Sequence, residues 1–327
     1  MLLEVADQSQ VSAARRAASE LARARGFDEV TAGRVALVAT ELATNLIKHA
    51  ERGEILMDSF LDSSGTGVEL LALDKGAGIA DLRRAFEDGM STAGSPGTGL
   101  GAIRRQADEL NIFSRPNLGT AIAARISHGT SKSKCTTIVG AVTSPCAGEA
   151  ICGDAWAGAN SSIGPTLLVA DGSGHGPAAA NAAQAAVRTF RDRIEEAGAA
   201  IMADMHRMLA PTRGAAVAVA RYDAAAKVVR FVGVGNIVGA VVAPDGQTRR
   251  MVSHNGTVGH IAARMHEFSY PCPAGSLIIL HSDGLSAKWD LSAYPGLAAS
   301  HPSLVAGILF RDFRRKNDDA TVVAMRV

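Results

Sequence analysis

Four polar residues in one apolar segment have the types and spacing that chemistry requires. In Glu41-Leu42-Ala43-Thr44-Asn45-Leu46-Ile47-Lys48-His49, the residues Glu41, Asn45, Lys48 and His49 recur at spacings of four, seven and eight. At those spacings their side chains share one face of a helix. A carboxylate on such a face can take a proton from a hydroxyl, and an amide oxygen can bind a divalent cation. The face therefore suits a ligand as well as it suits water.

Two glycine-containing segments further along the chain suit a nucleotide. Residues 74–79, Asp-Lys-Gly-Ala-Gly-Ile, follow an apolar run, so that a carboxylate able to accept a hydrogen bond from adenine stands at the end of a strand. The two glycines after it would let a flat ring approach the backbone. Residues 94–101, Gly-Ser-Pro-Gly-Thr-Gly-Leu-Gly, open a helix whose backbone N–H groups can hold phosphate. Either segment alone is more often just a turn. Their order after the polar helix predicts a nucleotide pocket.

A second group consists of aspartates that stand next to Gly or Asp at the ends of apolar runs. The places are Asp154, Asp171, Asp283 and the pair Asp318-Asp319. Each one alone reads as a turn residue. Four such places at comparable positions suggest one rim of acids, and carboxylates without Cys or spaced His suit Mg²⁺ or Mn²⁺. A pair of such ions can activate water for in-line attack on phosphorus.

The first group lies on elements that predict an α+β sandwich domain over residues 1–127. Helical spacing covers 11–25 and 35–50, and a further helix is expected over 100–109. Short β-rich runs at 54–60 and 67–73 flank a Ser/Gly turn, and two more follow near 111–114 and 120–126. Helices and hairpins in this order pack as one layer on another.

The second group lies in a strand-rich domain predicted over residues 136–327. A polar connector, 128–135, precedes it. Its expected strands are 136–142, 166–170, 215–222, 228–234, 238–242, 277–280 and 321–327, with helices over 178–196 and 201–209. We expect these helices to pack on sheets, the first of them behind Asp171 and Gly172.

Composition limits the classes of partner. A chain of 327 residues is long for one domain and comfortable for two. Lys and Arg number 33 against 32 Asp and Glu, a net charge of +1, so no overall field attracts nucleic acid or an anionic membrane. Hydrophobic residues make up 47% and aromatic residues 4%, which indicates a globular chain with an aliphatic core.

The cysteines and the N-terminus point to a reducing compartment. Cys135, Cys146, Cys152 and Cys272 have no metal-binding spacing, and no basic segment followed by an apolar run opens the chain. No window approaches about 18 uninterrupted apolar residues. We therefore expect a cytoplasmic protein without membrane or nucleic-acid partners, and we leave its oligomeric state open.

The polar helix, the DxGxG turn and the glycine-rich segment together resemble the N, G1 and G2 boxes of the GHKL ATPase superfamily. The resemblance implies that Asn45 coordinates Mg²⁺ on the phosphates of ATP, that Asp74 reads adenine and that a lid over about 89–95 covers the triphosphate. Lys48 and His49 are as well explained as the solvent edge of the helix. The residues implied for the nucleotide are Asn45, Lys48, His49, Asp74, Gly76, Gly78, Gly97, Thr98, Gly99, Leu100, Gly101 and Thr120.

Within that superfamily the compact start resembles the anti-sigma-factor and stressosome serine kinases. The segments that carry this resemblance are ADQSQVSAARRAASELARARGF and ATELATNLIKHA. It implies that Glu41 is the general base for a substrate serine or threonine hydroxyl. A histidine kinase would need an upstream helix pair with a phosphoacceptor, and only 40 residues precede Glu41.

The aspartate motifs resemble the SpoIIE-type branch of the metal-dependent (PPM) serine/threonine protein phosphatases, through GDAW, VADGSGHGPAAANAA, GVGNI, LHSDGLS and NDDATVV. The resemblance implies an αββα sandwich in which Asp171 bridges two metals and the Gly172 carbonyl helps to bind one. The remaining metal ligands it implies are Asp154, Asp283 and either Asp318 or Asp319. His175 is either a proton donor or a turn residue. The basic phosphate-binding side chain found early in the domain of some members has no obvious match here.

Two enzymes on one chain would control one phosphoprotein in opposite directions. The resemblances imply a STAS-domain substrate, of the anti-anti-sigma or stressosome scaffold type, phosphorylated with ATP by the first domain and dephosphorylated with Mg²⁺ or Mn²⁺ by the second. Such a cycle belongs to partner-switching control of a sigma factor. The alternative is a phosphatase whose first domain only binds ATP or a partner. A working kinase with a sensor in place of the phosphatase is the third reading.

Overall fold

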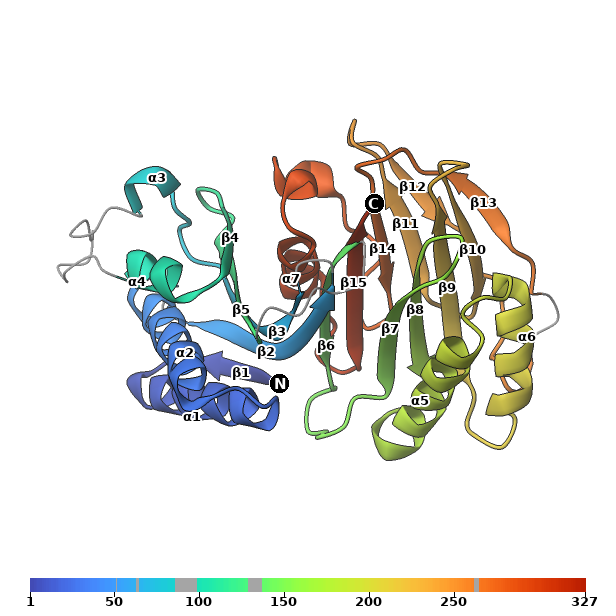
Figure 1. The fold of residues 1–327 in the computed structure, drawn as a ribbon, viewed down its shortest axis with the longest axis horizontal. Coiled ribbons are helices and arrows are strands. Elements are labelled where there is room, and N and C mark those ends of the chain that lie inside the picture. The colour runs from blue at the N-terminus through green and yellow to red at the C-terminus, as the bar shows by residue number, and fades with distance from the viewer. Residues whose placement is uncertain (51, 63–64, 86–98, 129–136, 262–264) are drawn as a thin grey trace. The chain divides into compact units, whose positions relative to one another are not determined.

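The computed structural model describes residues 1–327 except 51, 63–64, 86–98, 129–136 and 262–264, and the chain divides into two compact units, Met1–Lys134 and Cys135–Val327 (Figure 1). Each unit has its own core. Most of the predicted connector lies outside the described residues. His128 is described and packs in the first unit, where its ring meets Phe27 edge-on and its Nε2 lies 2.9 Å from the Gly26 carbonyl oxygen.

The first unit is one antiparallel sheet with helices on one face. Its five strands are ordered β1-β2-β3-β5-β4. Its elements are β1 (Leu2–Val5), α1 (Gln8–Ala24), α2 (Glu29–Ala50), β2 (Gly53–Asp62), β3 (Gly65–Asp74), α3 (Leu82–Ala85), α4 (Gly99–Gln106), β4 (Glu109–Ser114) and β5 (Thr120–Ser127). The predicted helices and hairpins are present, and β1 is an additional strand on the edge of β2.

Local sequence explains how the helices of this unit begin and pack. Asp7 caps α1: its carboxylate accepts from the Ser9 N–H at 2.8 Å, while the Gln10 side chain accepts from the Asp7 N–H at 3.0 Å. This reciprocal capping box satisfies donors that the first turn leaves open. Apolar residues at helical spacing in α1 and α2 then bury a common core against alternate residues of β2, β3 and β5.

By length and composition alone, helix α2 is long and apolar enough to cross a membrane. In this fold its apolar side packs instead on α1 and the sheet, with Val35, Val38 and Leu42 fully buried. The interior helix of a globular unit meets the same criteria. Its polar side carries Glu41 and Asn45, so the helix links the core of the unit to the candidate nucleotide site.

The second unit contains two five-stranded sheets and three α-helices in its described part. One sheet has the order β13-β10-β9-β8-β7 and the other β12-β11-β14-β15-β6. The elements are β6 (Ile138–Ser144), β7 (Asp154–Asn160), β8 (Pro165–Gly172), α5 (Gly176–Asp192), α6 (Gly198–Leu209), β9 (Ala215–Asp223), β10 (Val228–Val234), β11 (Val238–Val242), β12 (Thr248–Met251), β13 (Phe268–Pro271), β14 (Leu277–His281), α7 (Pro302–Phe313) and β15 (Ala320–Arg326), with 3₁₀ turns at Leu291–Ala293 and Leu297–Ala299.

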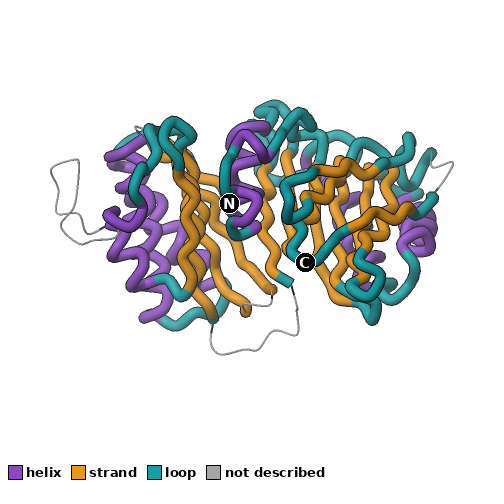
Figure 2. The backbone as a smooth tube through the Cα atoms, turned by 90° about the horizontal axis from the view of Figure 1, so that it is seen from above, coloured by secondary structure: helices purple, strands orange, loops and turns teal. Residues whose placement is uncertain are grey.

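The two sheets stack face to face between helices, as the resemblance implied. Leu167 and Val169 of β8 point toward the second sheet and share a core with Ile278 and Leu280 of β14. Alternate residues of β8, such as Leu168, point the other way, into a core with α5 and α6. Because side chains of a strand alternate between faces, one strand serves both layers. Figure 2 shows the strands of this unit flanked by helices, and the predicted αββα sandwich is confirmed.

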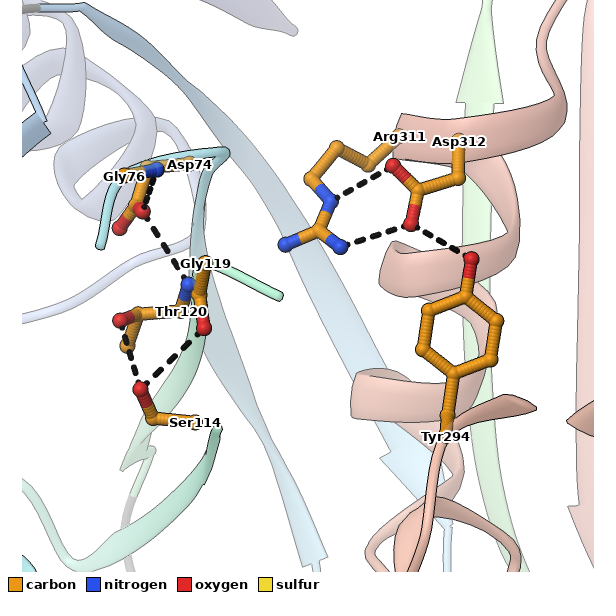
Figure 3. Close-up of polar contacts among 8 residues, drawn as sticks. All are labelled: Asp74, Gly76, Ser114, Gly119, Thr120, Tyr294, Arg311 and Asp312. Atoms are coloured by element: carbon orange, nitrogen blue, oxygen red, sulfur yellow. Dashed lines mark hydrogen bonds and ion pairs between the residues drawn. The ribbon is translucent and has the colours of Figure 1, made fainter. Parts of the chain in front are cut away.

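Helix α7 covers the outer face of the second sheet, on β6 and β15. Its residues 302–310 are buried, and Gly140 of β6 lets the helix come close, because a Cβ there would lie 2.0 Å from the Ser303 nitrogen. At its C-terminal end Asp312 accepts hydrogen bonds from Tyr294 Oη at 2.9 Å and from Arg311 (Figure 3). The element was not predicted, because a helix that is apolar all round has no periodic signature.

Candidate functional sites

The face of α2 that carries Glu41 and Asn45 lies against the first residue of α4. A Cβ added to Gly99 would lie 2.8 Å from Asn45 Oδ1 and 3.5 Å from Glu41 Oε2. The first turn of α4 therefore stands beside a carboxylate and an amide, with backbone N–H groups that favour anions. Leu100 and Gly101 belong to the same turn. Gly97, Thr98 and the predicted lid lie outside the described residues.

Asp74 is held in place at the end of β3. Its Oδ1 accepts hydrogen bonds from the Gly76 N–H at 2.8 Å and the Thr120 N–H at 3.1 Å (Figure 3). Ser114 supports the same corner: its Oγ accepts from the Ile79 N–H at 2.7 Å and lies 2.9 Å from Thr120 Oγ1. Two backbone N–H groups thus fix the carboxylate where the ends of β3, β4 and β5 meet, and Ser114 is a residue that sequence reasoning missed.

Gly76 and Gly78 make room for protein backbone. A Cβ on Gly76 would lie 2.9 Å from the His49 carbonyl oxygen, and one on Gly78, whose φ is +75°, would lie 2.0 Å from that of Arg115. We expected these glycines to admit a flat ring. In the structure they let the loop after Asp74 pass between the end of α2 and the turn after β4. Lys48 and His49 are exposed in that last turn of α2.

In the second unit Asp154 and Asp171 are directly opposite each other on paired strands β7 and β8. Opposed residues share one face of a sheet with Cβ atoms about 4.5–5.5 Å apart, where like charges destabilise the pairing. Asp283 follows β14, and its Oδ2 accepts from Asn236 Nδ2 at 2.7 Å. Asp154 Oδ2 accepts from Ser282 Oγ at 2.7 Å. Residues from several strands therefore hold these carboxylates toward one place.

Burial and the charges of neighbouring acids raise the pKa values of three of these aspartates. Burial, together with the charges of Asp154 and Asp283, raises the pKa of Asp171 to about 9. Burial, with Asp319 and Asp318 nearby, raises the pKa of Asp154 to about 7. Burial and Asp283 also raise the pKa of Asp318. A buried cluster of like charges favours the protonated forms in the absence of a cation.

The pair Asp318-Asp319 divides into two different environments. Asp319 is buried, and its two oxygens accept backbone hydrogen bonds from Cys146 and Gly153, each at 2.9 Å. Asp318 is partly exposed, and its Oδ1 accepts from the Asp319 N–H at 2.9 Å. The carboxylate of Asp319 is thereby engaged in fixing both ends of the segment that joins β6 to β7.

The cluster fits divalent cations that prefer oxygen ligands. Asp154 Oδ1 is buried without a hydrogen-bond partner among the described residues, which is costly unless a cation or water meets it. Within the same described ranges, no three His, Cys, Asp or Glu side chains are already arranged as a complete ligand set. A bound cation would therefore draw the repelling carboxylates closer together.

Next to this cluster, Gly172 allows α5 to pack closely on β8, and His175 lies within hydrogen-bond distance of Glu149. A Cβ on Gly172 would lie 2.0 Å from the Ala179 carbonyl oxygen, so only glycine lets α5 pack this tightly behind Asp171. His175 precedes α5, is exposed and lies 2.7 Å from Glu149 Oε1. Asn236 and Ser282 lie in the segments GVGNI and LHSDGLS, which sequence analysis singled out without giving these two residues roles.

Comparison with known proteins agrees with the two units. The sequence profile of the histidine kinase-like ATPase domain matches residues 5–126, and that of stage II sporulation protein E (SpoIIE) matches residues 166–327. The chain belongs to the proteins that join a histidine kinase-like ATPase domain of the GHKL type to a SpoIIE-type domain of the PPM phosphatase family. Its domains are those of a partner-switching regulator.

One relative resembles the first unit in particular. Serine/threonine-protein kinase RsbT of Bacillus subtilis (strain 168) is 36% identical over 114 residues, which cover 35% of this chain and 86% of RsbT.

Solved structures also resemble the chain. One, from a study of the bacterial stressosome as a modular system, is 29% identical with a TM-score of 0.53 and covers 58% of this chain and 100% of that one. RsbX in complex with magnesium, at 20% identity and a TM-score of 0.52, covers 59% of this chain and 96% of that one, and shows likeness of fold.

Proposed function

We propose that this protein is a bifunctional regulator of a STAS-domain phosphoprotein in the cytoplasm. Its first unit phosphorylates a serine or threonine of that protein with ATP, and its second unit hydrolyses the phosphoserine or phosphothreonine with Mg²⁺ or Mn²⁺. The convergence of Asp154, Asp171, Asp283 and Asp318, with one buried carboxylate oxygen left without a described partner, supports the second activity most strongly. The two activities would set the phosphorylated fraction in partner-switching control.

The cations would be held by Asp154, Asp171, Asp283, Asp318 and the carbonyl of Gly172. When bound, they supply charge neutralisation and an activated water for in-line attack on phosphorus. Asp171 lies opposite Asp154 and feels the charges of Asp283 and Asp318, and it is the residue that we propose would bridge the cations. Asp319 is better suited to positioning than to binding, because both its oxygens already accept backbone hydrogen bonds.

The remaining polar residues of this site would position those ligands. Ser282 donates to Asp154 and itself accepts from the Thr321 N–H at 3.0 Å, which ties β7 to the ends of β14 and β15. Asn236 orients Asp283 by its amide. Metal ligands that are themselves hydrogen-bonded keep their orientation and affinity.

In the first unit, Glu41 is the proposed general base and Asn45 the proposed ligand of the Mg²⁺ that accompanies ATP. Their proximity to Gly99 supports both roles, since both side chains lie beside the N-terminal turn of α4, where phosphate would lie. Asp74, fixed by two backbone N–H groups, would accept the adenine amine. The likeness to RsbT supports the choice of serine or threonine as acceptor.

The partner follows from the same likeness, since RsbT and stressosome structures belong to systems in which we expect STAS-domain proteins to be the substrates. Phosphate adds about 1.5 to 2 negative charges at neutral pH and breaks an interface by repulsion and desolvation. The modification would therefore decide which partner the STAS-domain protein binds.

Transfer of labelled phosphate separates a kinase from a module that only binds ATP. The full chain, with γ-labelled ATP and Mg²⁺, is given a candidate STAS-domain protein, and Glu41→Gln is compared with Glu20→Gln, an exposed glutamate of α1. We expect wild type and Glu20→Gln to label the protein and Glu41→Gln to bind ATP without labelling it. Equal labelling by both variants would contradict the role of Glu41, and ATP binding without labelling by any form would favour the binding module.

A further inference from the structure

The loop that follows Asp171 is joined to the turn before β9. The Ser173 N–H donates to the Gly214 carbonyl oxygen at 3.0 Å. Gly174, with a φ of +90°, is the next residue of the loop, and a Cβ there would lie 3.1 Å from Arg213 Nη1. The guanidinium of Arg213 therefore stands beside the backbone that leaves the candidate bridging carboxylate.

The turn that carries Arg213 is held from both sides. Thr212 Oγ1 accepts from the Gly214 N–H at 3.0 Å and donates to the Leu209 carbonyl oxygen at 2.7 Å. His260 Nε2 lies 3.0 Å from the Thr212 carbonyl oxygen. Strand β9 begins at Ala215, which exchanges backbone hydrogen bonds with Val258. These contacts fix the backbone at Arg213, so its side chain leaves from a defined point.

The Arg213 side chain is exposed and has no ion pair or hydrogen bond within the described part of the chain. Several other arginines of this unit are engaged: Arg193 and Arg207 pair with Asp204, and Arg230 pairs with Asp223. The five N–H donors of Arg213 thus remain available for an anion, and a guanidinium matches two phosphate oxygens at once.

The position of Arg213 beside Gly174 limits how far its guanidinium can lie from Asp171. Gly174 is three residues after Asp171, so their Cα atoms are at most about 11 Å apart. A Mg²⁺–oxygen bond of about 2.0–2.1 Å on one side of a phosphate and a hydrogen bond of about 2.7–2.9 Å on the other fit within that span. A guanidinium in direct contact with the carboxylates would form ion pairs with them, and Arg213 forms none within the described residues.

We propose that Arg213 binds the phosphoryl group of the substrate, an inference that rests on the phosphatase function proposed above. It takes the place of the basic side chain for which the sequence showed no match near the start of the domain. The residue comes from the turn between α6 and β9, far from that position in the sequence. Arg213 and the aspartates then hold opposite sides of one phosphate.

Binding of inorganic phosphate to the Mn²⁺-loaded full chain tests this directly. Calorimetry compares wild type, Arg213→Ala, Arg213→Lys and Arg207→Ala, the last being an exposed arginine of the neighbouring helix α6. We expect phosphate affinity to fall about tenfold or more in Arg213→Ala. Arg213→Lys should recover part of it, because a lysine restores the charge without the fork. Arg207→Ala should bind as wild type does, and Mn²⁺ affinity should be the same in all four.

Hydrolysis of a phosphoserine peptide by the same proteins separates this inference from the proposed function. Arg213→Ala should raise KM for the peptide. If wild type hydrolyses nothing yet its phosphate affinity depends on Arg213, the proposed function fails and the anion site stands. Phosphate affinity that is equal in wild type and Arg213→Ala, or a wild type that binds no phosphate, overturns the inference. So does an equal loss in Arg207→Ala, which would reveal only a general charge effect.

Discussion

Asp154 and Asp171 are opposed residues of paired strands, an arrangement that a folding chain should avoid on stability grounds alone. Each carboxylate lies among other acids, and Asp154 keeps one buried oxygen without a described partner. Two uncompensated acids face to face weaken the strand pairing. Their retention at this place is therefore best explained by a positive ligand, and the free energy of binding it would offset the cost.

This cost gives the metal-free protein a pH dependence with a definite sign. The pKa of Asp171 is raised to about 9 in the folded chain, so above about pH 4 the unfolded chain holds fewer protons than the folded one. The contribution of the protonated Asp171 carboxyl to folding stability is therefore complete below the pKa that Asp has in the unfolded chain, and it is lost as pH rises toward 9. In EDTA we expect Asp171→Asn to raise Tm, and to raise it more at pH 9 than at pH 5.

The same variant should lose its response to metal. Mn²⁺ should raise the Tm of wild type, because it binds the folded state, and should hardly affect Asp171→Asn. Asp192→Asn, which changes an exposed aspartate at the end of α5, serves as the control and should behave as wild type. If the Tm of Asp171→Asn in EDTA at pH 9 were below that of wild type, the ionised Asp171 would not destabilise the metal-free protein as we expect.

At this scale the sequence predicted residue types better than residue roles. The acids of the rim were recognisable because each follows an apolar run. The choice between Asp318 and Asp319 was not, since it depends on backbone N–H groups of Cys146 and Gly153, which reach Asp319 from distant parts of the sequence. Asn236 and Ser282 were overlooked for the same reason: their partners, Asp283 and Asp154, lie in other segments of the chain.

Among the elements, α5 packs so closely on β8 that one residue type decides the fit. A Cβ on Gly172 would meet the Ala179 carbonyl oxygen at 2.0 Å, while one on Gly158 of β7 would find its nearest neighbour at 3.6 Å. We expect Gly172→Ala to lower the free energy of unfolding by about 1–3 kcal/mol, as overpacking does. Gly158→Ala should be near neutral. Urea unfolding in EDTA measures both, and equal stabilities would contradict the packing described here.

A similar pair of glycines tests the first turn of α4. Gly99→Ala would press on Asn45, whose flexible side chain can move away, so the unit should fold and bind Mg²⁺-ATP more weakly. Gly33→Ala lies in α2 with no heavy atom within 4 Å of the added Cβ. It should gain about 0.5–1 kcal/mol of stability and bind the nucleotide normally. Equal nucleotide affinity in both variants, measured by calorimetry, would remove Gly99 from the site.

The elements most readily predicted were those with periodic sequences. Helix α1 and the central strands of the second unit lie within a few residues of their expected ranges, whereas α2 begins six residues before its expected start at residue 35. Two of the missed elements, β7 and α7, have weak local signals: β7 is rich in Ala, and α7 is apolar on nearly every side. Their positions are set by neighbours, since β7 pairs with β8 and α7 fills the outer face of β6 and β15.

For the whole molecule, two separate cores imply two separate responses to ligands. The first unit has its own hydrophobic cluster, and the second has two clusters that share no residue with it. In calorimetric unfolding we expect an ATP analogue with Mg²⁺ to raise the midpoint temperature of one transition of the wild type. It should not raise that temperature in the double variant Glu41→Gln, Asn45→Ala. In protein stripped of metal with EDTA and then freed of EDTA, Mn²⁺ added without nucleotide should raise the midpoint temperature of the other transition. A single transition that follows both ligands equally would show that the units unfold together.

The central claim, that both units act on one phosphoprotein, is tested by the time course of label on it. The full chain is incubated with Mg²⁺, Mn²⁺, γ-labelled ATP and the STAS-domain protein encoded nearest its own gene, in wild type, Asp171→Asn and Asp192→Asn. Once ATP is removed, label should decay with wild type and Asp192→Asn and persist with Asp171→Asn. Label that decays equally in all three would contradict the phosphatase site, and label that never appears in any of them would contradict the kinase.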